Sequence, residues 1–292
     1  RANANIISIL QGYSDPRLER WFATNNADIY STDDELSPVV EKATKYLGVR
    51  QGVPMTRTEY QGYSKTSRVG IPEQGPRPVL RVAEAYFLRA EGMLRNWNMG
   101  DGTPESLYNE GIHSAWASVL GDESGWAGTY ESYINGFINT EEGGDFDWEL
   151  FEGGFGSAPY INYRNQEYNY YIEENGKQVG INRISVRWHD EDSPEKKLQR
   201  IITQKWISFF PTLSSVAWTE YRRTGYPKLI PIPSDLNYSN GAIDTELQIR
   251  RLPFTQSEYR GNTEEVNKAL GLLKGPDNGG TRLWWDAGKN NF

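Results

Sequence analysis

One block of sequence constrains the fold more than any other, IITQKWISFFPTLSSVAWTEYRRTGYP at residues 201–227. Apolar residues recur every three or four positions from Leu198 to Phe210, which is the spacing of one face of a helix. Pro211 interrupts this stripe, and a second stripe runs to Tyr221 before Arg222-Arg223-Thr224-Gly225. Cations in a last turn followed by glycine are typical of a helix end. The block therefore predicts two packed helices within 195–223 with a sharp exit.

The tryptophans of these helices are predicted to serve the core. Trp206 and Trp218 lie on the two stripes, and Trp116 lies on a third stripe earlier in the chain. Apolar side chains on a helical stripe usually face the interior. Arg222 and Arg223 are interpreted as helix-end cations or as partners of buried carboxylates.

Composition excludes several classes of function. The chain of 292 residues has a net charge of −8, which argues against binding to nucleic acid. It has no cysteine, which excludes disulfides, thiolate zinc sites and cysteine nucleophiles. With only two histidines, a histidine-rich metal site or a serine–histidine triad is poorly supported. No apolar run approaches the length of about 18 residues that a membrane-spanning helix needs.

Helical signals also occur outside the block. Short helices are predicted at 2–12 and 15–22, and residues 24–77 read as mostly loop with a helical patch near 37–47. Stripes in 78–94 and 104–120, the second capped by Thr103, predict a helical hairpin of the tetratricopeptide type. A last helix is predicted at 263–273, with Asn262 as its cap and Glu265 in a capping-box position.

Residues 121–175 differ from the rest of the chain. They hold twelve acidic residues against one basic residue, and thirteen aromatic residues. A helix near 129–139 and a β-hairpin within 168–187, turning at Asn175-Gly176, are the only regular elements predicted there. Aromatic rings stack on the C–H faces of sugars, and Asp, Asn and Arg side chains hydrogen-bond to hydroxyls. Loops of this composition on a helical frame therefore favour a ligand-binding function.

The opening block resembles the C-terminal part of the SusD/RagB family of outer-membrane, glycan-binding lipoproteins, whose chains carry a similar TQKW(I)…W-x-(E/D)-Y-R-R-T-G-(Y/F)-P run. Other segments resemble the family in the same order, with Phe254 where tyrosine is common: DPRLERWF at 15–22, PVLRVAEAYFLRAEG at 78–92, RRLPFTQSEYRGNTEEVNKAL at 250–270 and RLWWD at 282–286. Because the chain opens on Arg1 without an initiator methionine, it is expected to be a fragment. By the resemblance, the family's N-terminal half, with its lipid-carrying cysteine, is absent.

The resemblance implies a mainly α fold with little β structure, in which tetratricopeptide-like helix pairs pack with an irregular, loop-rich lobe. The chain 1–292 would be the C-terminal portion of one SusD-like domain. Its expected parts are a helical hairpin at 78–121, an acidic aromatic lobe at 122–194, and C-terminal helices and tail at 195–292.

The resemblance also implies non-catalytic binding of a glycan or other nutrient at the cell surface. The expected partners are that ligand and a SusC-like TonB-dependent transporter, with no nucleic acid, and a lipid anchor in the outer membrane. No cofactor is expected. An irregular calcium site near Asp145 and Asp147 is an open alternative, although Leu150 and Gly156 stand where an EF-hand needs glycine and glutamate.

Ligand contacts are predicted in the acidic aromatic lobe rather than in the opening block, which is interpreted as a frame. For any one aromatic residue of the lobe, a place in the small core of the lobe is the preferred interpretation, whereas at least one of them is expected to line the ligand site. Two other functions stay open: a glycoside hydrolase using Asp145 and Glu149 as paired carboxylates, and a peptide-binding helical scaffold. The predicted ligand-binding residues are Trp126, Asp145, Trp148, Tyr160, Asn162, Tyr163, Arg164, Tyr168 and Tyr170, with Tyr171 beside them.

Overall fold

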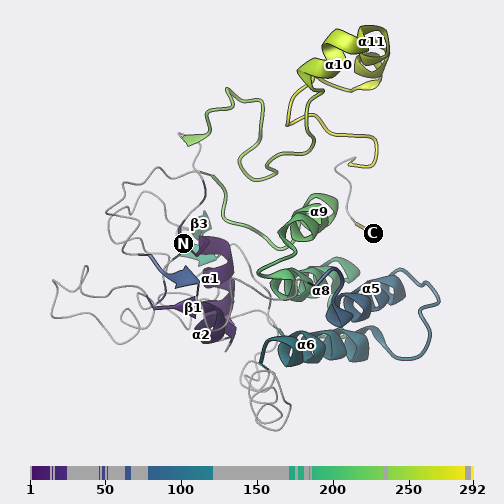
Figure 1. Cartoon of the computed structure of the whole chain (residues 1–292). Coiled ribbons are helices and arrows are strands. Elements are labelled where there is room, and N and C mark those ends of the chain that lie inside the picture. The colour runs from purple at the N-terminus through teal and green to yellow at the C-terminus, as the bar shows by residue number, and fades with distance from the viewer. Residues whose placement is uncertain are drawn as a thin grey trace, which may run out of the picture.

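The protein folds mainly into helices that pack around one central core (Figure 1). The computed structural model describes residues 2–13, 15, 17–24, 46, 48–49, 51, 63–66, 78–120, 171–174, 177–180, 184, 186–232, 236–286 and 291–292. Its elements are α1 (Ala4–Gly12), α2 (Arg17–Trp21), β1 (Phe22–Ala23), β2 (Lys65–Thr66), α5 (Val82–Leu94), α6 (Pro104–Leu120), β3 (Tyr171–Glu174), β4 (Lys177–Gly180), α8 (Pro194–Phe209), α9 (Ser214–Thr224), α10 (Gln256–Gly261) and α11 (Thr263–Leu272). The predicted mainly α fold with little β structure is confirmed.

The two helices predicted in the opening block are present as α8 and α9. The side chain of Ser193 accepts a hydrogen bond from the backbone N–H of Lys196 at 3.3 Å and so caps α8, whose first residue is Pro194. The chain turns between the helices at Pro211. Gly225 ends α9 in the left-handed conformation with φ 76°, which costs glycine little because it has no Cβ.

Helices α5 and α6 form the helical hairpin predicted from their stripes, but α5 begins at Val82 and not at Pro78, and Val79 is exposed. Thr103 and Ser106 exchange hydrogen bonds at the start of α6: the Thr103 hydroxyl accepts from the Ser106 N–H at 3.1 Å, and the Ser106 hydroxyl accepts from the Thr103 N–H at 2.8 Å. The two helices come close where Gly111 of α6 faces the ring of Phe87. Helix α8 packs against both, so the three helices form one layer (Figure 1).

The N-terminal helices complete the core by burying a charge. Arg17 is fully buried and bonds to the carboxylate of Asp15, with the closest nitrogen–oxygen distance 2.5 Å. Its guanidinium lies 5.6 Å from the ring centre of Trp21 and 5.8 Å from that of Trp116. Because the guanidinium of this ion pair contacts Trp116 of α6, the pair fixes where α2 packs on α6. Trp116 is buried, as predicted.

The last helix forms as predicted but without the predicted cap. Asn262 precedes α11, yet its side chain makes no capping hydrogen bond and donates instead to Glu258 at 3.3 Å. Glu265 pairs with Lys268 at 2.6 Å. The capping-box prediction is therefore wrong, because partners within one turn are available to both side chains. Helices α10 and α11 lie apart from the α5, α6 and α8 layer (Figure 1).

The predicted β-hairpin is present as an antiparallel pair, with Tyr171 opposite Gly180 and Glu174 opposite Lys177. A second small sheet pairs β1 with β2. The helices predicted near 37–47 and 129–139 lie outside the described residues. No helix in the described part of the chain is long and apolar enough to cross a membrane. The division into parts at 78–121, 122–194 and 195–292 stays a prediction.

Candidate ligand-binding pocket

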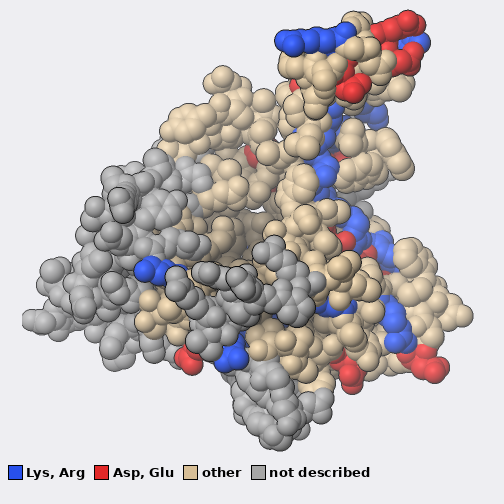
Figure 2. All heavy atoms as spheres, in the orientation of Figure 1, with Lys and Arg blue, Asp and Glu red and all other residues tan. Residues whose placement is uncertain are grey.

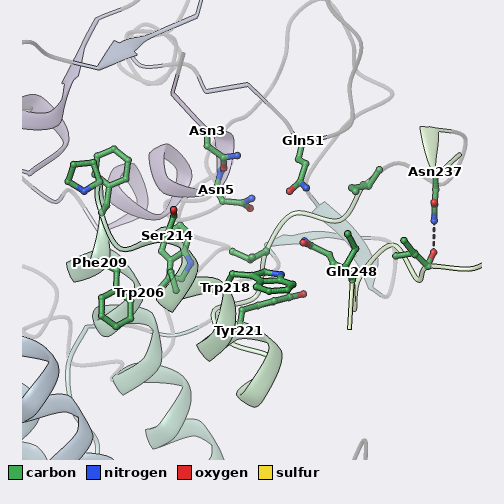
Figure 3. Close-up of a pocket in the computed structure, with 17 residues that line it drawn as sticks. Asn3, Asn5, Gln51, Trp206, Phe209, Ser214, Trp218, Tyr221, Asn237 and Gln248 are labelled. Atoms are coloured by element: carbon green, nitrogen blue, oxygen red, sulfur yellow. Dashed lines mark hydrogen bonds between the residues drawn. The ribbon is translucent and has the colours of Figure 1, made fainter. Parts of the chain in front are cut away.

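A pocket of about 440 Å³ lies beside the helix pair of the opening block (Figure 3). One side is formed by the end of α8, the turn after it, and α9. The other sides are formed by residues before and within α1, by Gln51, and by a segment that we call the strap, residues 229–232 and 236–249. The lining residues are Asn3, Asn5, Gln51, Trp206, Phe209, Phe210, Pro211, Ser214, Ala217, Trp218, Tyr221, Leu229, Ile232, Asn237, Ile243, Gln248 and Ile249.

The aromatic side of the pocket follows directly from helical periodicity. Ser214, Ala217, Trp218 and Tyr221 are spaced as i, i+3, i+4 and i+7, so they share one face of α9. Trp206 adds a second indole from α8. Trp218 is 37% exposed and Trp206 is partly buried. The prediction that Trp218 belongs to the core is therefore wrong, and Trp206 packs on the core while also lining the pocket.

The strap is held at the pocket by hydrogen bonds to residues of α1 and α9. The side-chain oxygen of Asn5 accepts from the backbone N–H of Ile230 at 2.7 Å, and Asn5 is only 6% exposed. The hydroxyl of Tyr221 donates to the carbonyl oxygen of Glu246. Burial raises the pKa of Tyr221, and Glu246 and Asp244 oppose the lowering by Arg250, so this phenol stays neutral and remains a donor.

A clasp of arginine residues fastens the strap at its far end. The guanidinium groups of Arg222 and Arg250 each donate to the backbone carbonyl of the other residue. Arg250 also pairs with Asp286 at 2.6 Å. The Arg222 guanidinium lies between two indoles, 4.6 Å from the ring centre of Trp218 and 5.1 Å from that of Trp285. One face of Trp218 is therefore occupied by a cation.

The amide side of the pocket carries polar groups with unused hydrogen-bonding capacity. The side-chain oxygen of Asn3 accepts from the backbone N–H of Asn5 at 2.8 Å, and that of Asn5 accepts from Ile230. Their NH₂ groups make no hydrogen bond within the described part of the chain, and neither do the side chains of Gln51 and Gln248. Figure 3 shows Asn3, Asn5 and Gln51 across the pocket from Trp218 and Tyr221, with Gln248 to one side.

Gln248 occupies a backbone conformation that side chains seldom adopt. Its φ is 54°, in the left-handed region where a residue with a Cβ is disfavoured by about 1–2 kcal/mol. Its backbone N–H donates to Asp244 at 3.0 Å and holds the turn. This turn places the Gln248 amide on the pocket wall.

Such a pocket suits binding more than chemistry. No Asp, Glu, His, Lys or Arg occurs among the described residues that line it, and the hydroxyl of Tyr221 already donates to the carbonyl oxygen of Glu246. It offers flat apolar rings on one side and hydrogen-bonding amides on the other. The described residues also contain no group of three His, Asp or Glu side chains arranged to hold a metal ion.

The ligand-binding residues predicted from sequence lie elsewhere in the chain. All nine, from Trp126 to Tyr170, and the calcium candidates Asp145 and Asp147, are outside the described residues and stay predictions. Tyr171 opens β3. Sequence reasoning passed over the pocket because its amides come from segments far apart in the chain. The available signal was the presence of two tryptophans on the predicted helix faces.

Comparison with known proteins identifies the family. The profile of the SusD-like family, described as Susd and RagB outer membrane lipoprotein, matches residues 1–133 and 155–286. No curated protein matches the chain. The family is one of non-catalytic binding proteins, and its description places it at the outer membrane.

Solved structures of this family share the fold. A chitin-binding SusD homolog from Flavobacterium johnsoniae is 37% identical with a TM-score of 0.72, and the match covers 100% of this chain and 50% of that one. A SusD homolog from Bacteroides vulgatus is 34% identical with a TM-score of 0.68, and the match covers 99% of this chain and 50% of that one. A SusD homolog from Bacteroides uniformis is 30% identical with a TM-score of 0.70, and the match covers 97% of this chain and 49% of that one. The chain thus spans about half the length of the structures that it matches. It belongs to the SusD-like family of outer membrane lipoproteins.

Proposed function

We propose that the protein binds a glycan in the pocket between α8, α9, α1 and the strap, and performs no chemistry on it. The observation that carries the proposal is that two partly exposed indoles lie across one cavity from side-chain amides whose NH₂ groups make no hydrogen bond within the described part of the chain. Sugar rings present apolar C–H faces and a rim of hydroxyls, and the two sides of this pocket complement these two features. A cavity of about 440 Å³ lies within the usual range for small-molecule sites and accommodates part of an oligosaccharide.

Chitin oligosaccharides are the first ligands to test. The Flavobacterium johnsoniae homolog is described as chitin-binding and is 37% identical to this chain. Its N-acetylglucosamine units carry an acetamido group, whose N–H and C=O can exchange hydrogen bonds with asparagine and glutamine amides. This feature supports chitin oligosaccharides as ligands of the pocket.

The experiment is calorimetric titration of the whole chain with N-acetylglucosamine oligomers, for the native protein and for Trp218→Ala and Trp206→Ala. Loss of a stacking ring is expected to weaken binding by about tenfold or more, because a central aromatic contact contributes about 1–2 kcal/mol. Trp218→Phe keeps a ring and should retain part of the affinity.

Trp97→Ala is the matched control. Trp97 is 60% exposed and does not line the pocket. Circular dichroism confirms that each variant is folded. If Trp218→Ala and Trp206→Ala bind as tightly as Trp97→Ala, the pocket is not the site. Trp126→Ala and Trp148→Ala then test the acidic aromatic lobe predicted from sequence.

The second part of the proposal is that the bound glycan passes to a TonB-dependent transporter in the outer membrane. Family membership supports this part. The test is co-expression with a TonB-dependent barrel encoded beside this gene, followed by purification through a tag on the barrel. A stoichiometric complex supports delivery, and its absence after mild solubilisation contradicts it.

A further inference from the structure

A second feature of the pocket is that the described residues lining it carry no charge. None of its described residues is Asp, Glu, Lys, Arg or His. This is unusual for a chain in which 24% of residues are charged. On the face shown in Figure 2, Lys, Arg, Asp and Glu gather on α10 and α11, in a line below them and over the helices, whereas the described surface beside this line is mostly uncharged.

Two charged side chains in the described part of the chain, which lie next to pocket-lining residues, are already engaged. The Arg222 guanidinium donates to the carbonyl of Arg250 and is stacked between Trp218 and Trp285. The carboxylate of Asp244 accepts from the backbone N–H groups of Glu246 and Leu247, both at 2.8 Å. These groups therefore hold the strap in place, and none of them lines the cavity.

The polar groups that line the cavity are uncharged and dispersed over its walls, and they include several donors. The NH₂ groups of Asn3 and Asn5 come from one wall, the indole N–H groups of Trp206 and Trp218 from another, and the Gln248 amide from the strap. Dispersed donors suit a ligand whose oxygens are spread around several rings. They suit a compact ionic group poorly, because a charge that leaves water without an opposite charge or converging donors loses hydration energy.

We infer that the pocket selects uncharged glycans and discriminates against sugars that carry ammonium, carboxylate or sulfate groups. This inference rests on the proposed glycan binding in the same pocket and adds the substrate class. At low salt, the net charge of −8 should also repel anionic sugars and so add to the discrimination against them. Binding of a neutral ligand should itself depend little on salt.

The test uses three oligomers of equal length on one backbone: N-acetylglucosamine, which is neutral, glucosamine, which is cationic, and N-sulfoglucosamine, which is anionic. Titration of the whole chain at 150 mM salt, in mildly acidic buffer where the glucosamine amines are protonated, should give the tightest binding for the neutral oligomer. Both charged oligomers should bind at least tenfold more weakly. Equal affinity for either charged oligomer overturns the inference and leaves glycan binding intact. No binding of any of the three overturns the proposed function together with the inference.

A variant pair ties the selectivity to the pocket. Gln248→Glu adds a carboxylate to the wall with almost no change of shape and should strengthen glucosamine-oligomer binding by about tenfold. Gln256→Glu makes the same chemical change on α10, at an exposed position outside the pocket, and should leave all three affinities unchanged. If the two variants behave alike, the pocket does not set the selectivity, and the inference is overturned.

Discussion

Glu91 shows how one buried carboxylate can connect several helices. It lies on α5 and accepts two hydrogen bonds from Arg223 of α9, at 2.6 and 2.7 Å, and others from Arg95, at 2.9 and 3.0 Å. Arg223 also pairs with Glu220, which bonds to the buried Lys205 of α8. The sequence interpretation of Arg223 as a partner of a buried carboxylate is confirmed.

Removing that partner should destabilise the fold. In Arg223→Ala, Glu91 keeps only Arg95, and we expect a loss of about 1–2 kcal/mol in the free energy of unfolding, reduced by the partial exposure of Arg223. Urea denaturation measures the loss. Arg260→Ala, at an exposed position of α10, is the control and should change stability by less than about 0.5 kcal/mol. Equal stability of the two variants would show that the bidentate pair contributes nothing.

The same pair predicts an acid dependence of stability. Burial acts to raise the pKa of Glu91, but hydrogen bonds and charges from Arg223 and Arg95 outweigh it and hold the pKa below its ordinary value of 4.5. A carboxyl whose pKa is lower in the folded state stabilises fully above its unfolded pKa, and this is lost as pH falls through the folded pKa. The unfolding free energy should therefore decrease below about pH 4.5. Denaturation across this range should show a shallower decrease for Arg223→Ala, and parallel curves would contradict the assignment to Glu91.

At the scale of elements, the end of α9 depends on one backbone conformation. A Cβ added at Gly225 would meet no atom within 4 Å, so only its φ of 76° resists substitution. Gly225→Ala should cost about 1 kcal/mol in unfolding free energy. Gly271→Ala, where space is also open within α11, should instead stabilise by about 0.5–1 kcal/mol because alanine favours helix. Thermal denaturation of the two variants should shift in opposite directions, and a shift in the same direction would reject the conformational explanation.

The contact between α5 and α6 gives a second prediction at this scale. A Cβ at Gly111 would lie 2.6 Å from a ring carbon of the buried Phe87, well inside contact distance. Gly111→Ala should therefore destabilise by about 1–3 kcal/mol despite the better helix propensity of alanine. The double variant with Phe87→Leu should recover part of this loss in chemical denaturation. An unchanged stability for Gly111→Ala alone would mean that the two helices do not pack this closely.

At the scale of the whole molecule, the pocket depends on contacts between segments that are far apart in the chain. Asn5 and Ile230 are 225 residues apart and joined by one buried hydrogen bond. Asn5→Ala leaves the Ile230 N–H without this partner and should cost about 1–3 kcal/mol, with weaker ligand binding because the strap loses its attachment. Denaturation and titration measure the two effects. Asn262→Ala, which removes only the bond to Glu258, is the control and should change neither. A stable Asn5→Ala variant with native affinity would show that the strap does not depend on this bond.

How much of the structure can be predicted from the sequence depends on how far apart in the chain the interacting residues lie. The helices α5, α6, α8 and α9 could be predicted because stripe spacing, Thr103, Pro211 and Gly225 act within a few residues. The same reasoning placed Trp218 in the core, because periodicity shows which residues share a helix face but not what covers that face. It also placed a capping box at Asn262, because it could not weigh the competing bond to Glu258.

By itself, the sequence determined the family, the mainly α architecture and the limits of α8 and α9 to within a residue or so, since these depend on local patterns and on motifs that stand in one order. Only the tertiary structure decided that the signature helices form one side of a pocket. That outcome depends on the strap that passes over Trp218 and on amides brought from Asn3, Asn5 and Gln51. Packing across about two hundred residues of chain sets which of these surfaces remain uncovered, and no local pattern carries that information.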